Sequence, residues 1–248
     1  MDVLYTIGER SKHDNQELRW SLRSLVKYGK NLGKIIVAGY PPDWLADSVI
    51  KVNVPRTKED LHKFSSILKS IIVCAEKKIV DGDFLLSSDD HFLSKDFDLE
   101  STPFYKKRDH LPLKLDELTT GGTSYRKCLY VTGEVLRKYG YSDIQSNFHK
   151  NTRLNSSVVD EVKQLIDLEK SNPLAEHGYE ATILFQNVYA KHNQVDFQKT
   201  RDWKLEEYKQ EAIDSGAFSI SDKVFSDKRF IDYMNAEFGK PCVYEKYF

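Results

Sequence analysis

The chain has 248 residues, of which 40% are hydrophobic and 30% are charged, and its formal net charge is -1. This composition predicts a soluble protein with one large domain, and it excludes a general electrostatic attraction to nucleic acid or anionic lipid. The three cysteines, Cys74, Cys128 and Cys242, are widely spaced, which favours free thiols over a disulfide framework or a zinc site. No signal-peptide pattern and no membrane-spanning apolar run is present, so we expect a cytoplasmic location.

The first half of the chain alternates apolar runs with helical patterns. Runs of strand character occupy residues 3–7, 35–38, 49–54 and 84–87. Asp14 with Glu17 predicts the start of one helix, and Thr57 with Asp60 predicts the start of another. Strands that alternate with helices predict a mainly parallel sheet with right-handed crossovers.

The second half of the chain is predicted to be mostly helical. Helical patterns cover residues 125–136, 158–168, 179–189, 203–213 and 230–238, and extended pieces are expected at 102–105 and 218–220. No linker-like stretch separates the two halves, so we expect one α/β domain over residues 1–248.

One stretch joins a predicted buried strand to two adjacent carboxylates. The apolar run 84–87 leads through Ser88 into Asp89 and Asp90. In an open α/β sheet, ligands bind at the carboxyl ends of such strands. Two neighbouring carboxylates repel each other, and a divalent cation relieves that repulsion and can hold a diphosphate. The alternative is that the pair caps the turn or helix that follows, although one carboxylate is enough for a cap.

Several segments resemble known transferases. The conserved opening of the Stealth-type sugar-phosphate transferases, relatives of the GT-A glycosyltransferases, is similar to residues 15–25 (NQELRWSLRSL), 34–37 (KIIV) and 42–45 (PDWL). The aspartate pair of that family, and the DxD motif of GT-A enzymes, resemble residues 87–93 (SSDDHFL), with Ser88 in place of the first Asp. Their closing segments resemble residues 218–222 and 241–245. In size the chain is nearer to compact phage and bacterial glycosyltransferases.

The resemblance implies a GT-A-like, Rossmann-like domain, with a nucleotide-sugar-binding half over residues 1–110 and a helix-rich acceptor-side half over 111–248. It implies a metal-dependent glycosyltransferase that moves a sugar from a UDP- or GDP-sugar to an acceptor hydroxyl, with Mn or Mg as cofactor. Asp90 would bind the cation and act in catalysis, and Asp89 would assist as a second metal and donor ligand. Ser88 would face the ribose, where a hydroxyl supplies a hydrogen bond but no charge.

Further donor-binding candidates are Thr6, Gly8, Arg10, Arg19 and Lys63. Gly8 permits close approach of a ligand to the backbone after the first strand, and an ordinary turn is the alternative. Arg19 can recognise a phosphate through two hydrogen bonds. The alternatives are a salt bridge to Glu17 or a position on a solvated helix face. Lys63 lies on the helix that flanks the donor in the related families, although most such lysines face solvent.

The resemblance also implies a third metal ligand in the second half, often a histidine. His177, at the predicted start of a helix, is the candidate, and a structural role is the alternative. An inverting enzyme needs a carboxylate base near the acceptor, for which Glu180 and Asp109 are the candidates. A retaining enzyme needs no such base, and both stereochemical outcomes stay open.

The acceptor is expected to meet His91 and the basic cluster Lys106, Lys107 and Arg108. Cations beside aromatic residues suit either a glycan or a polyanion such as modified phage DNA, and a solvated loop is the alternative. These expectations place the enzyme in the cytoplasm of a bacterium or of a phage-infected host cell. Two other functions stay open, a Stealth-like sugar-1-phosphate transferase and a non-catalytic nucleotide- or glycan-binding domain.

Overall fold

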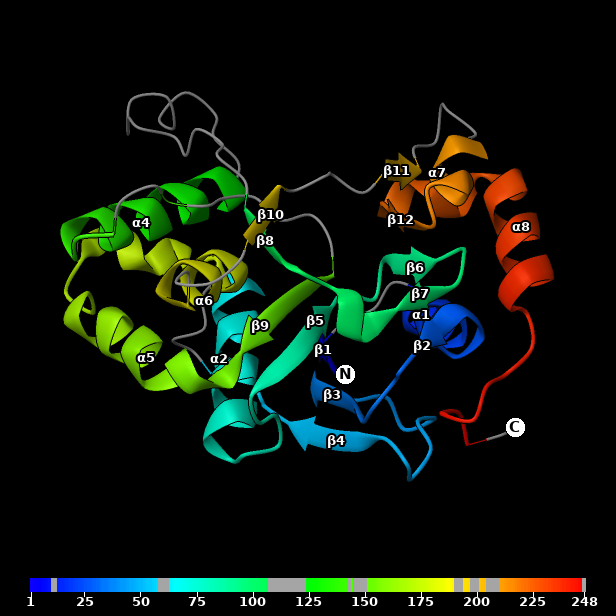
Figure 1. Cartoon of the computed structure of the whole chain (residues 1–248), viewed down its shortest axis with the longest axis horizontal. Helices are drawn as coiled ribbons and strands as arrows, with labels where there is room; N and C mark the ends of the chain where they lie inside the picture. Colours follow the sequence, from blue (N-terminus) through cyan, green and yellow to red (C-terminus); the bar gives the residue numbers. More distant parts are fainter. Residues whose placement is uncertain are drawn as a thin grey trace.

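The computed structural model describes residues 1–9, 13–57, 63–106, 124–141, 144, 151–189, 194–196, 201–203 and 210–246. A central sheet of five strands runs through them in the order β4-β3-β1-β5-β9 (Figure 1). Its strands are β1 (Asp2–Ile7), β3 (Ile35–Gly39), β4 (Ile50–Asn53), β5 (Asp83–Ser87) and β9 (Thr152–Asn155). The first four are parallel to one another, and β9 is antiparallel to β5. The predicted α/β fold with a mainly parallel sheet is confirmed.

Helices cover both faces of this sheet. Alternate residues of β1 point to opposite faces, so Leu4 packs with one cluster of buried side chains and Val3 and Tyr5 pack with another. The Leu4 face carries α2 (Lys63–Glu76), α4 (Ser124–Lys138), α5 (Val159–Leu168) and α6 (Ala181–Tyr189). The opposite face carries α1 (Gln16–Tyr28) (Figure 1). Because both faces are covered, β3 and most of β1 and β5 are apolar, which is why their sequence predicted them well, whereas β4 also carries Lys51 and Asn53.

The strand order reverses beside β1. The chain builds outward from β1 to β3 and β4 on one side, and then crosses to β5 on the other side of β1. The carboxyl ends of neighbouring strands diverge at such a reversal, and this crevice is where open α/β sheets bind ligands. The Asp89–Asp90 pair follows β5, which is one of the two strands at the reversal.

A smaller sheet begins where β5 ends. After the turn at Asp89 and Asp90, β6 (His91–Leu93) pairs antiparallel with β12 (Ala217–Ile220), which pairs in parallel with β11 (Arg201–Trp203). The flanking helices are α7 (Gln210–Asp214) and α8 (Lys228–Phe238). Two short pairs complete the described strands, β2 (Gly29–Lys30) with β7 (Phe97–Asp98) and β8 (Phe104–Lys106) with β10 (Gln194–Asp196).

Two predicted features of the elements are wrong. The predicted helix 203–213 begins only at Gln210 within the described residues, because Trp203 belongs to β11 and pairs with Ile220. The first helix does not start at an Asp14–Glu17 box, because Asn15 is the residue before it and both Asp14 and Asn15 adopt left-handed backbone angles. Short polar side chains tolerate that conformation. Among the described helices, none combines the length and apolar character needed to cross a bilayer.

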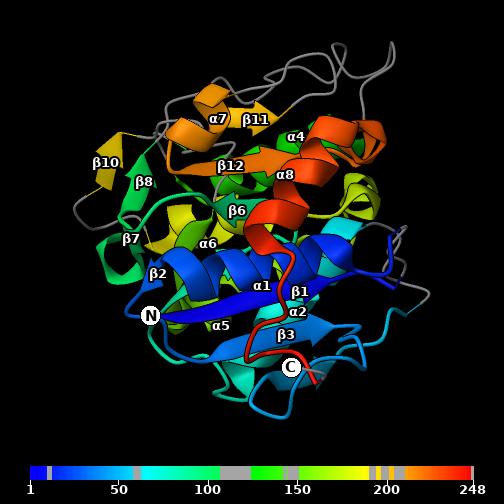
Figure 2. The same ribbon diagram turned by 90° about the vertical axis from the view of Figure 1, so that its right-hand side faces the viewer.

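A buried ion-pair cluster holds the C-terminal tail against α1. The tail after α8 runs across α1 in Figure 2, and Glu245 within it is 4% exposed. Its carboxylate accepts hydrogen bonds from Arg19 Nη1 at 2.9 Å, from Arg23 Nε at 2.7 Å and from the Cys242 amide at 3.0 Å. Burial alone raises the pKa of Glu245, but these donors outweigh it, and the pKa is lowered overall.

Replacing Glu245 by Gln is expected to lower the free energy of unfolding by about 3 kcal/mol, because two arginines then lose a buried partner. Chemical denaturation at pH 7 measures the change. The matched control is Asp232→Asn, which breaks an exposed pair with Lys228 on α8 and is expected to cost about 0.5 kcal/mol or less. Equal losses in the two variants would contradict a stabilising role for the cluster.

Candidate functional site

A cavity of about 620 Å³ opens at the carboxyl edge of the sheet, beside the strand reversal. Such a volume is typical of ligand sites. Each parallel strand contributes to its wall, with Thr6 and Gly8 from the end of β1, Tyr40 after β3, Arg56 after β4, and residues 86–91 around the end of β5. Most of the remaining described wall comes from α2, from Glu17 of α1, from Tyr125 of α4 and from the start of α6.

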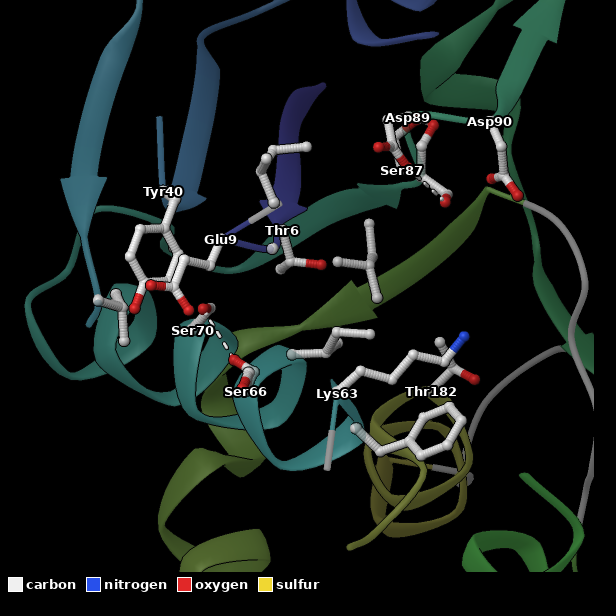
Figure 3. A pocket seen from close by; sticks show the side chains of 18 of the residues that line it. Thr6, Glu9, Tyr40, Lys63, Ser66, Ser70, Ser87, Asp89, Asp90 and Thr182 are labelled. Atoms are coloured by element: carbon white, nitrogen blue, oxygen red, sulfur yellow. Dashed lines mark hydrogen bonds between the residues drawn. The ribbon is translucent and has the colours of Figure 1, made fainter. Parts of the chain in front are cut away.

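The cavity is chemically different at its two ends. Figure 3 shows Asp89 and Asp90 at one end and Tyr40 with Glu9 at the other. Lys63 extends from α2 along the wall toward Thr182. The site therefore offers an aromatic and polar end, a basic side wall and an acidic end.

The acidic end is a turn fixed from both sides. The amide of His91 donates to the carbonyl of Ser88 at 3.2 Å, and the amide of Ile220 in β12 donates to the carbonyl of Asp90 at 3.1 Å. The turn joins β5 of the main sheet to β6 of the smaller sheet. The two aspartates thus belong to a turn between strands, and they do not start a helix. Their positions are set by two sheets.

Two other carboxylates act electrostatically on Asp89 at this end. Burial, followed by the charges of Asp90 and Glu17, raises the pKa of Asp89 to about 7. Its hydrogen bonds with the backbone and with Ser88 lower this pKa, but by less. Glu17 comes from the first turn of α1 and lines the same cavity. The described wall as a whole carries five carboxylates (Glu9, Glu17, Asp89, Asp90 and Glu180) and two basic groups (Arg56 and Lys63). The cavity is therefore strongly acidic.

His91 has a fixed orientation at the same end. Its Nδ1 lies 3.1 Å from Asn151 Oδ1, which also accepts a hydrogen bond from Ser87 Oγ at 3.0 Å. Because this oxygen accepts, Nδ1 carries the proton in the neutral ring. Nε2 is turned toward Asp90, 3.9 Å from Oδ1. That oxygen is buried and accepts no hydrogen bond from the residues the structure describes.

The structure brings eight of the predicted residues to this one cavity: Thr6, Gly8, Lys63, Ser88, Asp89, Asp90, His91 and Glu180. At Gly8, a Cβ atom would meet nothing within 4 Å, so the space in front of this backbone is open to a ligand. One carboxylate oxygen of Glu180 already caps α6. This oxygen, Oε2, accepts hydrogen bonds from the Ile183 amide at 2.7 Å and from Thr182 Oγ1 at 2.6 Å. Burial raises its pKa.

Two predicted residues lie elsewhere. Arg19 stacks over Trp44 at 3.9 Å and pairs with Glu245 of the C-terminal tail, not with Glu17, and it does not line the cavity. His177 ends η3 (Pro173–His177), with Nε2 3.7 Å from a carboxylate oxygen of Glu176, and it does not line the cavity.

A closed metal site of several protein side chains is not formed among the described residues. No group of three or more His, Cys, Asp and Glu side chains is arranged there to hold a metal. The expected set of His177 with Asp89 and Asp90 is therefore not assembled. Of the remaining candidates, Arg10, Lys107, Arg108 and Asp109 lie outside the described residues, as does the side chain of Lys106 at the end of β8.

Several wall residues were not among the predicted site residues. Tyr40 and Arg56 follow β3 and β4 in the way that Asp89 follows β5. Because ligands bind at the carboxyl ends of parallel strands, their positions in the sequence were sufficient to predict them. Glu17 had no such indication, because its proximity to Asp89 depends on how α1 packs on the sheet. The serines Ser66 and Ser70 reach the wall from the face of α2 that borders the cavity (Figure 3).

Comparisons with known proteins do not assign this arrangement. No protein-family model matches the chain, and no curated protein matches it significantly. The chemistry of the cavity is therefore the basis for any assignment of function.

The raised pKa of Asp89 predicts a pH-dependent cost to stability. Between the unfolded value near 4 and the folded value of about 7, the folded state keeps a proton that the unfolded state has lost. The contribution of Asp89 to the free energy of unfolding therefore falls as the pH rises through this range. Asp89→Asn should be more stable than the wild type at pH 8, with a smaller difference at pH 4.5, measured by chemical denaturation.

The control for this experiment is Asp47→Asn, because the Asp47 side chain is 99% exposed and lies outside the cavity. Its difference from the wild type should be the same at both pH values. A constant difference for Asp89→Asn as well would contradict the proposed crowding of carboxylates.

Proposed function

We propose that the chain is a divalent-metal-dependent glycosyltransferase that moves a sugar from a nucleotide-sugar donor to an acceptor hydroxyl. The observation that carries this proposal is the Asp89–Asp90 turn at the carboxyl end of β5, in the wall of a 620 Å³ cavity beside the strand reversal. A ligand site at that edge is the general property of open α/β sheets. The resemblance of residues 15–25 and 87–93 to GT-A-type transferases points to the same class.

The shape of the cavity supports a long ligand with distinct ends. Tyr40 offers an aromatic surface for a base, and Thr6 offers a hydroxyl for a ribose. Lys63 is the basic group proposed to meet phosphates, whereas Arg56 lies beside Tyr40, whose hydroxyl accepts a hydrogen bond from the Arg56 amide at 2.9 Å. The aspartates lie at the other end from Tyr40 (Figure 3), where the diphosphate and the sugar of such a donor would be.

The acidity of the cavity supports a metal-dependent mode of binding. A diphosphate is an anion, and it would meet a described wall with five carboxylates and two basic groups. The residues fit a cation at this point, since Asp90 Oδ1 is buried without a hydrogen bond from described residues and Asp89 is crowded by like charges. Mg²⁺ is commonly held by one or two carboxylates together with substrate phosphates. When bound, the cation would neutralise the diphosphate as the bond to the sugar breaks.

The chain's own groups would then orient the donor and accept a proton. The bond between the anomeric carbon and the diphosphate oxygen breaks, the acceptor oxygen bonds to that carbon, and the hydroxyl proton must leave. Ser88 would hydrogen-bond the ribose, and the open space before Gly8 would admit it. Glu180 is a weaker candidate for the base than its sequence suggested, because one of its oxygens caps α6.

Thermal denaturation with nucleotide sugars tests the donor site. A matching UDP- or GDP-sugar should raise the melting temperature by about 5 °C at a hundred-fold excess over its Kd, and only with Mn²⁺ or Mg²⁺ present. The ion is required because the acidic wall otherwise repels the diphosphate. If no nucleotide sugar stabilises the protein with either ion, the proposal is wrong.

Asp90→Asn should lower the turnover of that donor by at least about 100-fold and remove the metal-dependent thermal shift, because the cation loses a charged ligand. Asp47→Asn is the control and should keep both. Chromatography of the released nucleotide identifies the reaction, because glycosyl transfer releases a nucleoside diphosphate and sugar-1-phosphate transfer releases a monophosphate. Donor binding with no released nucleotide would instead indicate a non-catalytic binding domain.

A further inference from the structure

A second cavity of about 290 Å³ adjoins the first, and His91 is the one described residue that lines both. Its walls come from β6, β7, β12 and η1 (Leu99–Ser101), together with Asn151 just before β9. Seven of its fourteen described lining residues are apolar, including Phe92, Phe97, Leu99 and Phe218. The cavity is thus a small apolar chamber with a histidine at its boundary with the proposed donor site.

Two polar groups in this chamber are arranged for a ligand. The first is Thr102, which lines the chamber and is 2% exposed, and whose Oγ1 makes no hydrogen bond within the described residues. A buried hydroxyl without a partner is unfavourable, and a polar atom of a bound molecule would satisfy it. By contrast, Lys95 and Ser215 in the same wall already donate to backbone carbonyls at 2.7 Å.

The second polar group is the imidazole of His91. Asn151 holds Nδ1, and the carbonyl of His91 accepts a hydrogen bond from Ser21 Oγ at 2.7 Å, so the ring and its backbone are both fixed. Nε2 is the nitrogen left to accept a proton. Asp90 Oδ1, 3.9 Å away, would stabilise the positive charge that the ring then carries.

We propose that the second cavity binds the acceptor as a small, mostly apolar alcohol or phenol, and that His91 is the base that takes its hydroxyl proton. This inference rests on the proposed function, which supplies the donor in the first cavity. The acceptor O–H proton goes to Nε2 of His91, and the acceptor oxygen forms a bond to the anomeric carbon. The bond from that carbon to the diphosphate oxygen breaks, and its electron pair leaves with the nucleoside diphosphate.

The size and polarity of the chamber select the class of acceptor. Its volume lies just below the range for drug-sized ligands, so it admits one ring with a short side chain. Apolar walls would not compensate for desolvating a sugar or a phosphate. A molecule with a hydroxyl at each end of a ring would place one at His91 and the other at Thr102. DNA and glycan acceptors are the competing outcomes.

Binding of two matched probes to the full chain tests the chamber without any donor. Tyrosol and 2-phenylethanol differ only in a phenolic hydroxyl, and ligand-observed NMR measures their Kd values. The wild type should prefer tyrosol by about ten-fold, because the extra hydroxyl pairs with Thr102. Thr102→Val keeps the shape and should lose the preference, whereas Thr102→Ser should keep it. If neither probe binds, or if Thr102→Val keeps the preference, the inference is overturned.

A second experiment tests the role of His91 with the donor and ion that stabilise the protein. Sugar transfer to tyrosol, measured at saturating donor, should fall by about 100-fold or more in His91→Gln. Equal turnover in the two proteins, or transfer to DNA or a glycan but not to tyrosol, overturns the inference and leaves the proposed function standing. If the alcohols bind and no nucleotide sugar does, the proposed function fails, and the acceptor role fails with it.

Discussion

The repulsion among Glu17, Asp89 and Asp90 is the constraint on which the site depends. The three carboxylates come from α1 and from the turn after β5, and both elements are packed rigidly on the main sheet. The pairing of β5 with β1 and of β6 with β12 fixes the backbone on either side of the turn that carries Asp89 and Asp90. The pKa of Asp89 is raised to about 7 by burial first, and then by the charges of Asp90 and Glu17. A fold that keeps such an unfavourable arrangement is typical of functional sites.

The same helix that supports the core also sets the position of this turn. Ser21 and Ser24 lie on the buried face of α1, where apolar residues would normally pack. Ser24 Oγ accepts a hydrogen bond from the Leu93 amide at 3.1 Å, and Ser21 Oγ bonds the His91 carbonyl and the hydroxyl of Tyr5. Two hydroxyls in the core therefore tie β6 to α1 and β1, so the geometry of the site follows from the packing of the core.

The sequence was sufficient for features that depend on local pattern. Four parallel strands follow from apolar runs, and the aspartates fall at the cavity because strand ends share an edge. Features set by distant contacts could not be predicted. Arg19 binds Glu245, which lies 226 residues away in the chain, and nothing near Arg19 indicates that partner. The antiparallel strand β9 is short and mixed in polarity, so its four residues resemble a loop until β5 pairs with them.

Asp90 links the two proposed halves of the reaction. Its Oδ1, the buried oxygen proposed to meet the cation, lies 3.9 Å from His91 Nε2, and its side chain is 44% exposed. In the proposed transfer, positive charge would develop on the imidazole as negative charge moves to the leaving group. Asp90 would stabilise the first directly and, with a cation bound, the second through that cation. Among the described residues, His91 is the one that lines both cavities. The acidic turn and the apolar chamber are thus parts of one arrangement.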